Sequence, residues 1–158
     1  MVSVGKQVKN FTLPATGDQS LSLSNFRNHS LIIYFYPRDN TPGCTREGQD
    51  FSRLYTQFKA AGAEILGVSR DSVRTHENFR KKQGFPFQLL SDSEEVLCRQ
   101  FDVIHEKNMY GRKVMGIVRS TFLLDPDGVL QHEWRKVRVP DHAQAVLDKL
   151  TELAGTSI

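Results

Sequence analysis

The sequence predicts an α/β protein, with a mixed central sheet, helices on both of its faces and a β-hairpin extension at the N-terminus. Residues 31–36 and 63–69 are short apolar runs rich in β-forming side chains, a pattern typical of strands buried on both faces. Segments with helical spacing alternate with these runs, as they do in parallel β-α-β units. Near the C-terminus, Asp125-Pro-Asp-Gly128 is a strong hairpin signal that adds antiparallel strands.

The first half of the chain predicts a hairpin, a buried strand and a helix. Residues 11–13 and 21–23 alternate apolar and polar side chains around a turn at residues 16–18, which indicates the hairpin. The strand at 31–36 ends at Pro37, and a loop with a second proline and a glycine follows. A helix is expected from about Cys44, with Gly62 as its terminator, because four apolar side chains form one stripe: Phe51, Leu54, Tyr55 and Phe58.

The second half predicts two further strand–helix units, a hairpin and a final helix. Asp71 or Ser72 is the candidate cap of the first internal helix, and Ser91 or Asp92 that of the second. The last helix follows Pro140 and has one apolar face. The predicted extents are strand 63–69, helix 72–82, strand 87–90, helix 91–101, and strands 117–124 and 129–134. No repeat or linker interrupts this order, so residues 1–158 are expected to form a single domain.

Composition restricts the class of protein. Hydrophobic residues make up 39% and charged residues 25%, a balance typical of soluble globular proteins. The net charge of +3 includes two short basic runs, 80–82 and 135–138, which we interpret as solvated surface, not as a nucleic-acid site. No apolar run approaches the roughly 20 residues of a membrane span, and the first ten residues are polar. We therefore expect a cytoplasmic protein without membrane contact.

The segment that carries chemistry is the loop and helix start at residues 37–48, which read PRDNTPGCTREG. Cys44 falls in the first helical turn, where free backbone N–H groups and the helix dipole favour an anion such as a thiolate. Gly43 leaves these amides open to a ligand, and the Thr41 hydroxyl can accept and donate hydrogen bonds beside the sulfur. Since such a segment is not typical of a core, we interpret Cys44 as reactive.

Arg119 is a second candidate site residue. It falls within the predicted strand 117–124, where an unpaired charge is unfavourable unless it has a function. The alternative is an arginine that reaches solvent from the strand end. Glu47, in the first turn of the helix after Cys44, either holds a cation such as Arg119 or complements the helix dipole.

These residues resemble a known family. Pro37-x-x-x-Thr41-x-x-Cys44 resembles the peroxiredoxin active-site signature, and its extension to Glu47 resembles the bacterioferritin-comigratory, or Q-type, subfamily. The resemblance runs nearly end to end and includes Gly67-Val-Ser69-x-Asp71-Ser72, Lys107-Asn-Met-Tyr-Gly111, Arg119-Ser-Thr-Phe122 and Asp125-x-x-Gly128. It implies a thioredoxin-like fold and a thiol-dependent peroxidase in antioxidant defence.

The resemblance also implies roles for individual residues. Cys44 is the peroxidatic cysteine, Thr41 hydrogen-bonds the peroxide, Pro37 shields the sulfur from water, and Arg119 joins the site through the fold. The thiolate attacks hydrogen peroxide or an organic hydroperoxide and becomes a sulfenic acid, without metal or other cofactor. The five histidines show no ligand spacing, which agrees with this chemistry. The subfamily resemblance further implies a monomer.

The chain departs from the family in how a sulfenic acid is resolved. Relatives place a resolving cysteine where this chain has Gln49, or in the next helix where it has Arg80, so only Cys98 remains. Cys98 is either a small core residue or a resolving cysteine that reaches Cys44 after local unwinding. A disulfide needs Cα atoms within about 7 Å, and nothing in the pattern brings the two helices so close. We expect a one-cysteine mechanism, with thioredoxin, glutaredoxin or a low-molecular-weight thiol as the reductant.

Two other functions are compatible with parts of the pattern. A thioredoxin-fold binding or chaperone module without peroxidase turnover would explain the missing resolving cysteine, but it leaves the Thr41, Cys44 and Arg119 set unexplained. A disulfide oxidoreductase would need a vicinal cysteine pair, and Gly43 and Thr45 flank a lone cysteine. Consumption of peroxide distinguishes the peroxidase from the binding module, and reduction of insulin disulfides would reveal the oxidoreductase.

Overall fold

The computed structural model describes residues 1–155, and its central strand β3 (Ser30–Phe35) is apolar on both faces. Successive side chains of a strand point to opposite faces, so β3 contributes to two cores. Leu31, Ile33 and Phe35 belong to one hydrophobic cluster. Ile32 and Tyr34 belong to the other. The sheet built around β3 therefore has to be covered on both sides.

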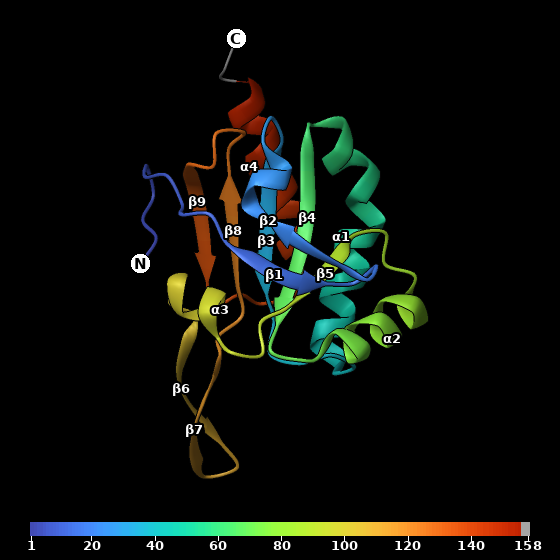
Figure 1. Ribbon diagram of the computed structural model, residues 1–158, viewed down its shortest axis with the longest axis vertical. Coiled ribbons are helices and arrows are strands. Elements are labelled where there is room, and N and C mark those ends of the chain that lie inside the picture. The colour runs from blue at the N-terminus through green and yellow to red at the C-terminus, as the bar shows by residue number, and fades with distance from the viewer. Residues whose placement is uncertain (156–158) are drawn as a thin grey trace.

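The main sheet has seven strands in the order β2-β1-β5-β4-β3-β8-β9 (Figure 1). Strands β3, β4 and β5 run parallel, whereas β8 and β9 pair antiparallel beside β3, and β1 pairs antiparallel with β5. The elements are β1 (Thr12–Ala15), β2 (Gln19–Ser22), a 3-10 turn (Leu23–Phe26), β3, α1 (Pro42–Ala60), β4 (Ala63–Ser69), α2 (Val73–Gln83), β5 (Gln88–Ser91), α3 (Val96–Gln100), β6 (Ile104–Met109), β7 (Arg112–Ile117), β8 (Ser120–Leu124), β9 (Leu130–Arg135) and α4 (His142–Gly155). The predicted α/β class and mixed sheet are confirmed.

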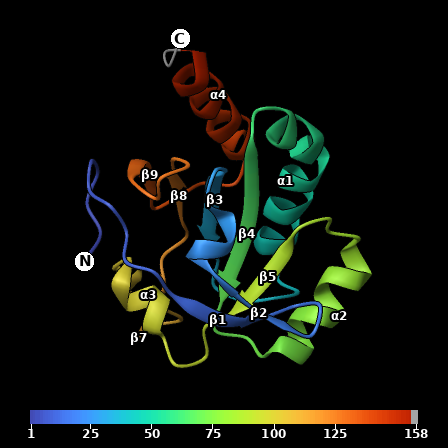
Figure 2. The same cartoon turned by 45° about the horizontal axis from the view of Figure 1, so that its top comes forward.

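Helices cover the two faces unequally. Side chains from α1, α2 and α4 form one core with Ile32 and Tyr34, and we call this side the α1 face. The N-terminal segment and α3 form the other core with Ile33 and Phe35, which we call the α3 face. Figure 2 shows α1 and α2 on one side of the sheet and α3 with the N-terminal segment on the other. No helix within residues 1–155 is long and apolar enough to span a bilayer.

The prediction missed the β6–β7 hairpin, which forms a two-stranded sheet of its own and projects from the body (Figure 1). Its turn, Tyr110-Gly111, has positive φ at both residues (54° and 79°), the geometry that matches the twist of a two-residue hairpin. Most side chains of these strands are exposed. Because neither face of the hairpin is buried along its length, the sequence carries no apolar alternation that would predict it.

Two predicted boundaries were wrong. The expected strand 117–124 is interrupted, since β7 ends at Ile117 and β8 begins at Ser120, so Arg119 lies in the junction and not on a strand. The expected helix 91–101 contains only Val96–Gln100. The carboxylate of Asp92 nevertheless accepts hydrogen bonds from the amides of Leu97 and Cys98. Asp92 therefore still caps two backbone N–H groups in the first turn of that helix, although it lies outside the helix.

Candidate active site

Cys44 lies at the N-terminal end of α1, directly after the loop that follows β3. Thr41 is the N-cap residue, in extended conformation (φ −91°, ψ 152°), and Pro42 occupies the first helical position, where a missing N–H costs no hydrogen bond. The amides of Gly43 and Cys44 belong to the first turn, whose N–H groups have no partner within the helix. The Cys44 side chain is buried, with 2% exposure. The sulfur therefore lies at the N-terminal end of the 19-residue helix α1, which is the positive end of the helix dipole.

Arg119 approaches this sulfur from the junction of β7 and β8. Its Nη2 lies 3.5 Å from Cys44 Sγ, and its Nη1 donates to Glu47 Oε1 at 2.6 Å. The side chain is only 16% exposed. One guanidinium thus bridges the thiol and the carboxylate, although the three residues come from two segments that are 72 positions apart. The alternative of an arginine that reaches solvent is not what the structure shows.

Gly43 allows this approach. A Cβ placed on Gly43 would lie 3.1 Å from Arg119 Nη2, closer than most side-chain contacts. A larger residue at this position would displace the guanidinium from the sulfur. The glycine was expected to admit a ligand to the backbone amides, and the structure adds that it admits the arginine.

Glu47 is the second partner of Arg119. It is 1% exposed, and its Oε2 has no hydrogen-bond partner among residues 1–155. Burial raises the pKa of Glu47 from its ordinary value of 4.5 to about 7, while the Arg119 cation opposes that shift. Of the two roles open from the sequence, holding the arginine is the one that this geometry supports.

Thr41 and Pro37 line the loop before the helix, and both are partly exposed. The Thr41 hydroxyl donates to the carbonyl oxygen of Arg38 at 2.9 Å. Because this bond engages the hydroxyl hydrogen, the oxygen is left to accept a hydrogen bond from a bound molecule. Pro37 follows the last residues of β3 and ends the strand.

A buried network of hydrogen bonds connects the same loop to the rest of the fold. The Asp39 carboxylate accepts from the Tyr36 hydroxyl at 2.6 Å and lies 2.7 Å from Nδ1 of His76 on α2. The other ring nitrogen of His76 lies 2.8 Å from the carbonyl of Leu90 on β5, which can only accept. The network ties the loop to α2 and β5.

Asp39, Asp71 and His76 are close enough to offer a common metal site, but each already has hydrogen-bond partners. This grouping could not be predicted from the sequence because its members lie on three different segments.

Cys98 is remote from this site. It is completely buried in the cluster on the α3 face, whereas Cys44 belongs to the cluster on the α1 face. Burial, and then the neighbouring Asp92 carboxylate, raise the pKa of the Cys98 thiol far above its ordinary value. Both cysteines are free thiols. The sheet therefore separates a protonated Cys98 from Cys44.

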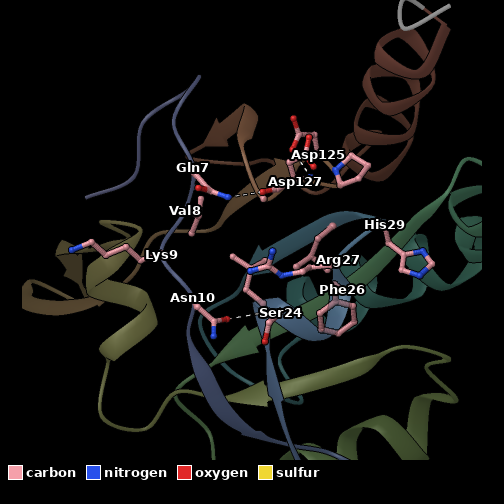
Figure 3. Close-up of a pocket in the computed structure, with 14 residues that line it drawn as sticks. Gln7, Val8, Lys9, Asn10, Ser24, Phe26, Arg27, His29, Asp125 and Asp127 are labelled. Carbon is pink, nitrogen blue, oxygen red and sulfur yellow. Dashed lines mark hydrogen bonds between the residues drawn. The ribbon is translucent and has the colours of Figure 1, made fainter.

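A cavity of about 230 Å³ lies away from Cys44, between the N-terminal segment and the β8–β9 turn. Figure 3 shows Lys9, Arg27 and His29 together with Asp125 and Asp127 around it. Asp125 already accepts from backbone amides of its own turn. With charges of both signs and neither cysteine in its lining, this cavity is not where the peroxide chemistry would occur.

Comparisons with known proteins agree with the geometry. The AhpC/TSA family profile matches residues 4–133. Peroxiredoxin Bcp of Xanthomonas campestris is 58% identical over 142 residues, which are 89% of either chain. The chain belongs to the peroxiredoxin family. Peroxiredoxin Bcp of Bacillus subtilis is 40% identical and covers 97% of this chain and 98% of its own. These relatives place this peroxiredoxin in the bacterioferritin-comigratory, or Q-type, subfamily.

Solved structures support the same assignment. The bacterioferritin comigratory protein of X. campestris, whose structures trap intermediate and ligand complexes of alkyl peroxide reduction, superposes with a TM-score of 0.87 at 56% identity over 91% of this chain and 92% of its own. A cysteine-to-serine variant of Xylella fastidiosa PrxQ superposes with a TM-score of 0.93 at 47% identity over 98% of both chains. The thioredoxin-like fold is confirmed, and this peroxiredoxin is a thiol-dependent peroxidase.

Proposed function

We propose that this peroxiredoxin reduces hydrogen peroxide and organic hydroperoxides at Cys44 by a one-cysteine mechanism, with an external thiol as the reductant. The contact between Arg119 and Cys44 Sγ at 3.5 Å carries the assignment, because it places a cation beside a thiol at the N-terminal end of the long helix α1. That cation favours the thiolate in the ground state. It also favours the negative charge that develops on the peroxide oxygens during attack.

The reaction follows from these positions. The Cys44 thiolate attacks one peroxide oxygen, so an S–O bond forms while the O–O bond breaks. Sulfur gives up two electrons, and the second oxygen leaves as hydroxide or alkoxide, which takes a proton to become water or an alcohol. Arg119 donates to the oxygens throughout, and the Thr41 hydroxyl oxygen accepts from the peroxide O–H. Pro37 limits the access of water to the sulfur. The product is a sulfenic acid on Cys44.

An external thiol then completes the cycle. A first thiol attacks the sulfenic acid and releases water, which leaves a mixed disulfide on Cys44. A second thiol reduces that disulfide and restores the Cys44 thiol. Thioredoxin, glutaredoxin or a low-molecular-weight thiol can supply both equivalents. The separation of the two cysteines by the sheet, and the raised pKa of Cys98, support this route over an internal disulfide.

We further propose a monomer in the cytoplasm. Cys44, Arg119 and Glu47 come from one chain, so the site needs no partner subunit. Free thiols and a thiol reductant suit a reducing compartment.

The test is mass spectrometry of the reduced protein after one equivalent of hydrogen peroxide, with a trap for sulfenic acid present. We expect rapid labelling of Cys44 and a free thiol at Cys98. The Cys44→Ser variant is the control and should stay unlabelled. An unmodified wild-type protein after minutes would contradict the assignment of Cys44.

A further inference from the structure

Thr41 occupies the N-cap position of α1 without capping the helix. A threonine at this position ordinarily accepts a hydrogen bond from an amide of the first turn, and that bond occupies its oxygen. Within residues 1–155 the Thr41 side chain makes no capping bond, and its hydroxyl donates instead to the carbonyl oxygen of Arg38 at 2.9 Å. The side chain therefore leaves both its oxygen and the amides of Gly43 and Cys44 open to a bound peroxide.

The peptide unit between Arg38 and Asp39 is held from both sides. Its carbonyl oxygen accepts from Thr41, and its N–H, which belongs to Asp39, donates to Asp71 Oδ2 at 2.9 Å. In a trans peptide the C=O and the N–H lie in one rigid plane and point in opposite directions. A rotation of this plane that broke the bond to Asp71 would therefore also move the carbonyl away from the Thr41 hydroxyl.

Asp71 is itself fixed by two central strands of the sheet. The Ser69 hydroxyl, at the end of β4, donates to Asp71 Oδ2 at 2.5 Å and accepts from the Asp71 amide at 3.1 Å. The Ser91 hydroxyl, at the end of β5, donates to the Asp71 carbonyl oxygen at 2.6 Å. Both serines are buried. The position of the Asp71 carboxylate is thus set by the sheet, independently of the loop that it holds.

We propose that Asp71 is a positioning residue for the peroxide reaction and acts on Thr41 through the Arg38–Asp39 peptide. This inference rests on the proposed function, in which the Thr41 oxygen accepts from the peroxide O–H. A carboxylate bound to the N–H of a peptide unit polarises that unit and makes its C=O a stronger acceptor. The Thr41 hydrogen then stays on the carbonyl, and the Thr41 oxygen stays turned to the peroxide. Without Asp71 the peptide is free to rotate, and Thr41 is free to cap the helix with that oxygen.

The experiment is a double-mutant cycle on the full chain. The rate constant for oxidation of reduced Cys44 by hydrogen peroxide is measured by rapid mixing and acid quench, so the reductant plays no part. We expect Asp71→Ala to lower it by about tenfold. Thr41→Val lacks the hydroxyl that Asp71 positions, so the addition of Asp71→Ala to Thr41→Val should change the rate constant by less than about twofold. A residue that only supported the fold would cause the same loss in both backgrounds.

Two further variants separate position from stability. Ser72→Ala removes the cap of α2, whose side chain accepts from the Thr75 amide at 3.2 Å, and should lower stability but leave the rate constant unchanged. Asp71→Asn keeps an acceptor oxygen without the charge, so its loss should be smaller, about threefold, and again absent beside Thr41→Val. This second cycle tests the proposal even where Asp71→Ala does not fold.

Equal losses with and without the Thr41 hydroxyl would overturn the proposal, and so would the absence of any loss. If hydrogen peroxide failed to oxidise wild-type Cys44, the proposed function itself would fail.

Discussion

Glu47 is a buried carboxylate whose Oε2 has no hydrogen-bond partner within residues 1–155, so its charge costs stability that Arg119 only partly offsets. The same residue fixes the guanidinium beside the thiol. Stability and function therefore compete at this position. A neutral Glu47 avoids the desolvation cost of a buried charge, whereas an ionised Glu47 makes a stronger, charge-assisted hydrogen bond with Arg119.

This competition predicts a pH dependence of stability. The pKa of Glu47 rises from 4.5 to about 7 on folding, so its protonated form stabilises the fold below about pH 4.5 and that stability is lost as the pH rises through 7. Glu47→Gln mimics the protonated form. Between pH 4.5 and 7.5, we expect the free energy of unfolding of the wild type to fall relative to Glu47→Gln by about 3 kcal/mol. Chemical denaturation at several pH values measures this. Glu94→Gln, on the surface, is the control, and parallel curves for wild type and Glu47→Gln would contradict the assignment.

The loop that carries Thr41 and Pro37 depends on an element that contributes no catalytic group. His76 of α2 holds Asp39 of the loop at 2.7 Å, and both side chains are fully buried. A buried pair of this kind adds little net stability, but the loss of one member removes a hydrogen-bond partner that water cannot replace in the core. The tie between α2 and the loop is therefore strong only when both members are present.

A double-mutant cycle tests this tie. We expect His76→Leu alone to lower the free energy of unfolding by about 3–5 kcal/mol, because it leaves the buried Asp39 carboxylate with the Tyr36 hydroxyl as its remaining side-chain partner. Asp39→Ala in the same chain should recover part of that loss. The measurement is denaturant unfolding of the wild type, both single variants and the double variant. Additive effects of the two substitutions would show that the pair is not coupled.

Elements with a clear burial pattern were predicted well from the sequence. The strand Ala63–Ser69 matches its predicted bounds, and α2 begins after Ser72, one of its two predicted caps, and ends at Gln83, before Gly84, whose φ is 70°. The β6–β7 hairpin was missed because its strands pair with each other and not with a buried sheet. The short α3 was overestimated because Asp92 caps it across a gap that the sequence does not reveal.

At the scale of the whole molecule, the sheet decides which residues can meet. The sequence pointed to Cys44, Thr41, Pro37 and Arg119 by residue type and by family resemblance, but it could not reveal the pair formed by Asp39 and His76. That pair joins the loop before α1 to α2. Contacts between distant segments leave little trace in local periodicity, and this is why the pair went unnoticed while the helix start that holds the sulfur did not.

The same sheet predicts the fate of the second cysteine. Cys98 lies in the core of the α3 face and Cys44 in that of the α1 face, so a disulfide between them would require the unwinding of α3 and the opening of a core. We expect Cys98→Ala to cost about 1–2 kcal/mol of stability through lost packing, and to leave the rate of peroxide turnover with an external thiol within about twofold of wild type. Steady-state peroxide consumption and non-reducing mass analysis measure the two effects. A Cys44–Cys98 disulfide in the oxidised wild type, together with slow turnover of Cys98→Ala, would mean that α3 opens during the cycle and that Cys98 resolves the sulfenic acid.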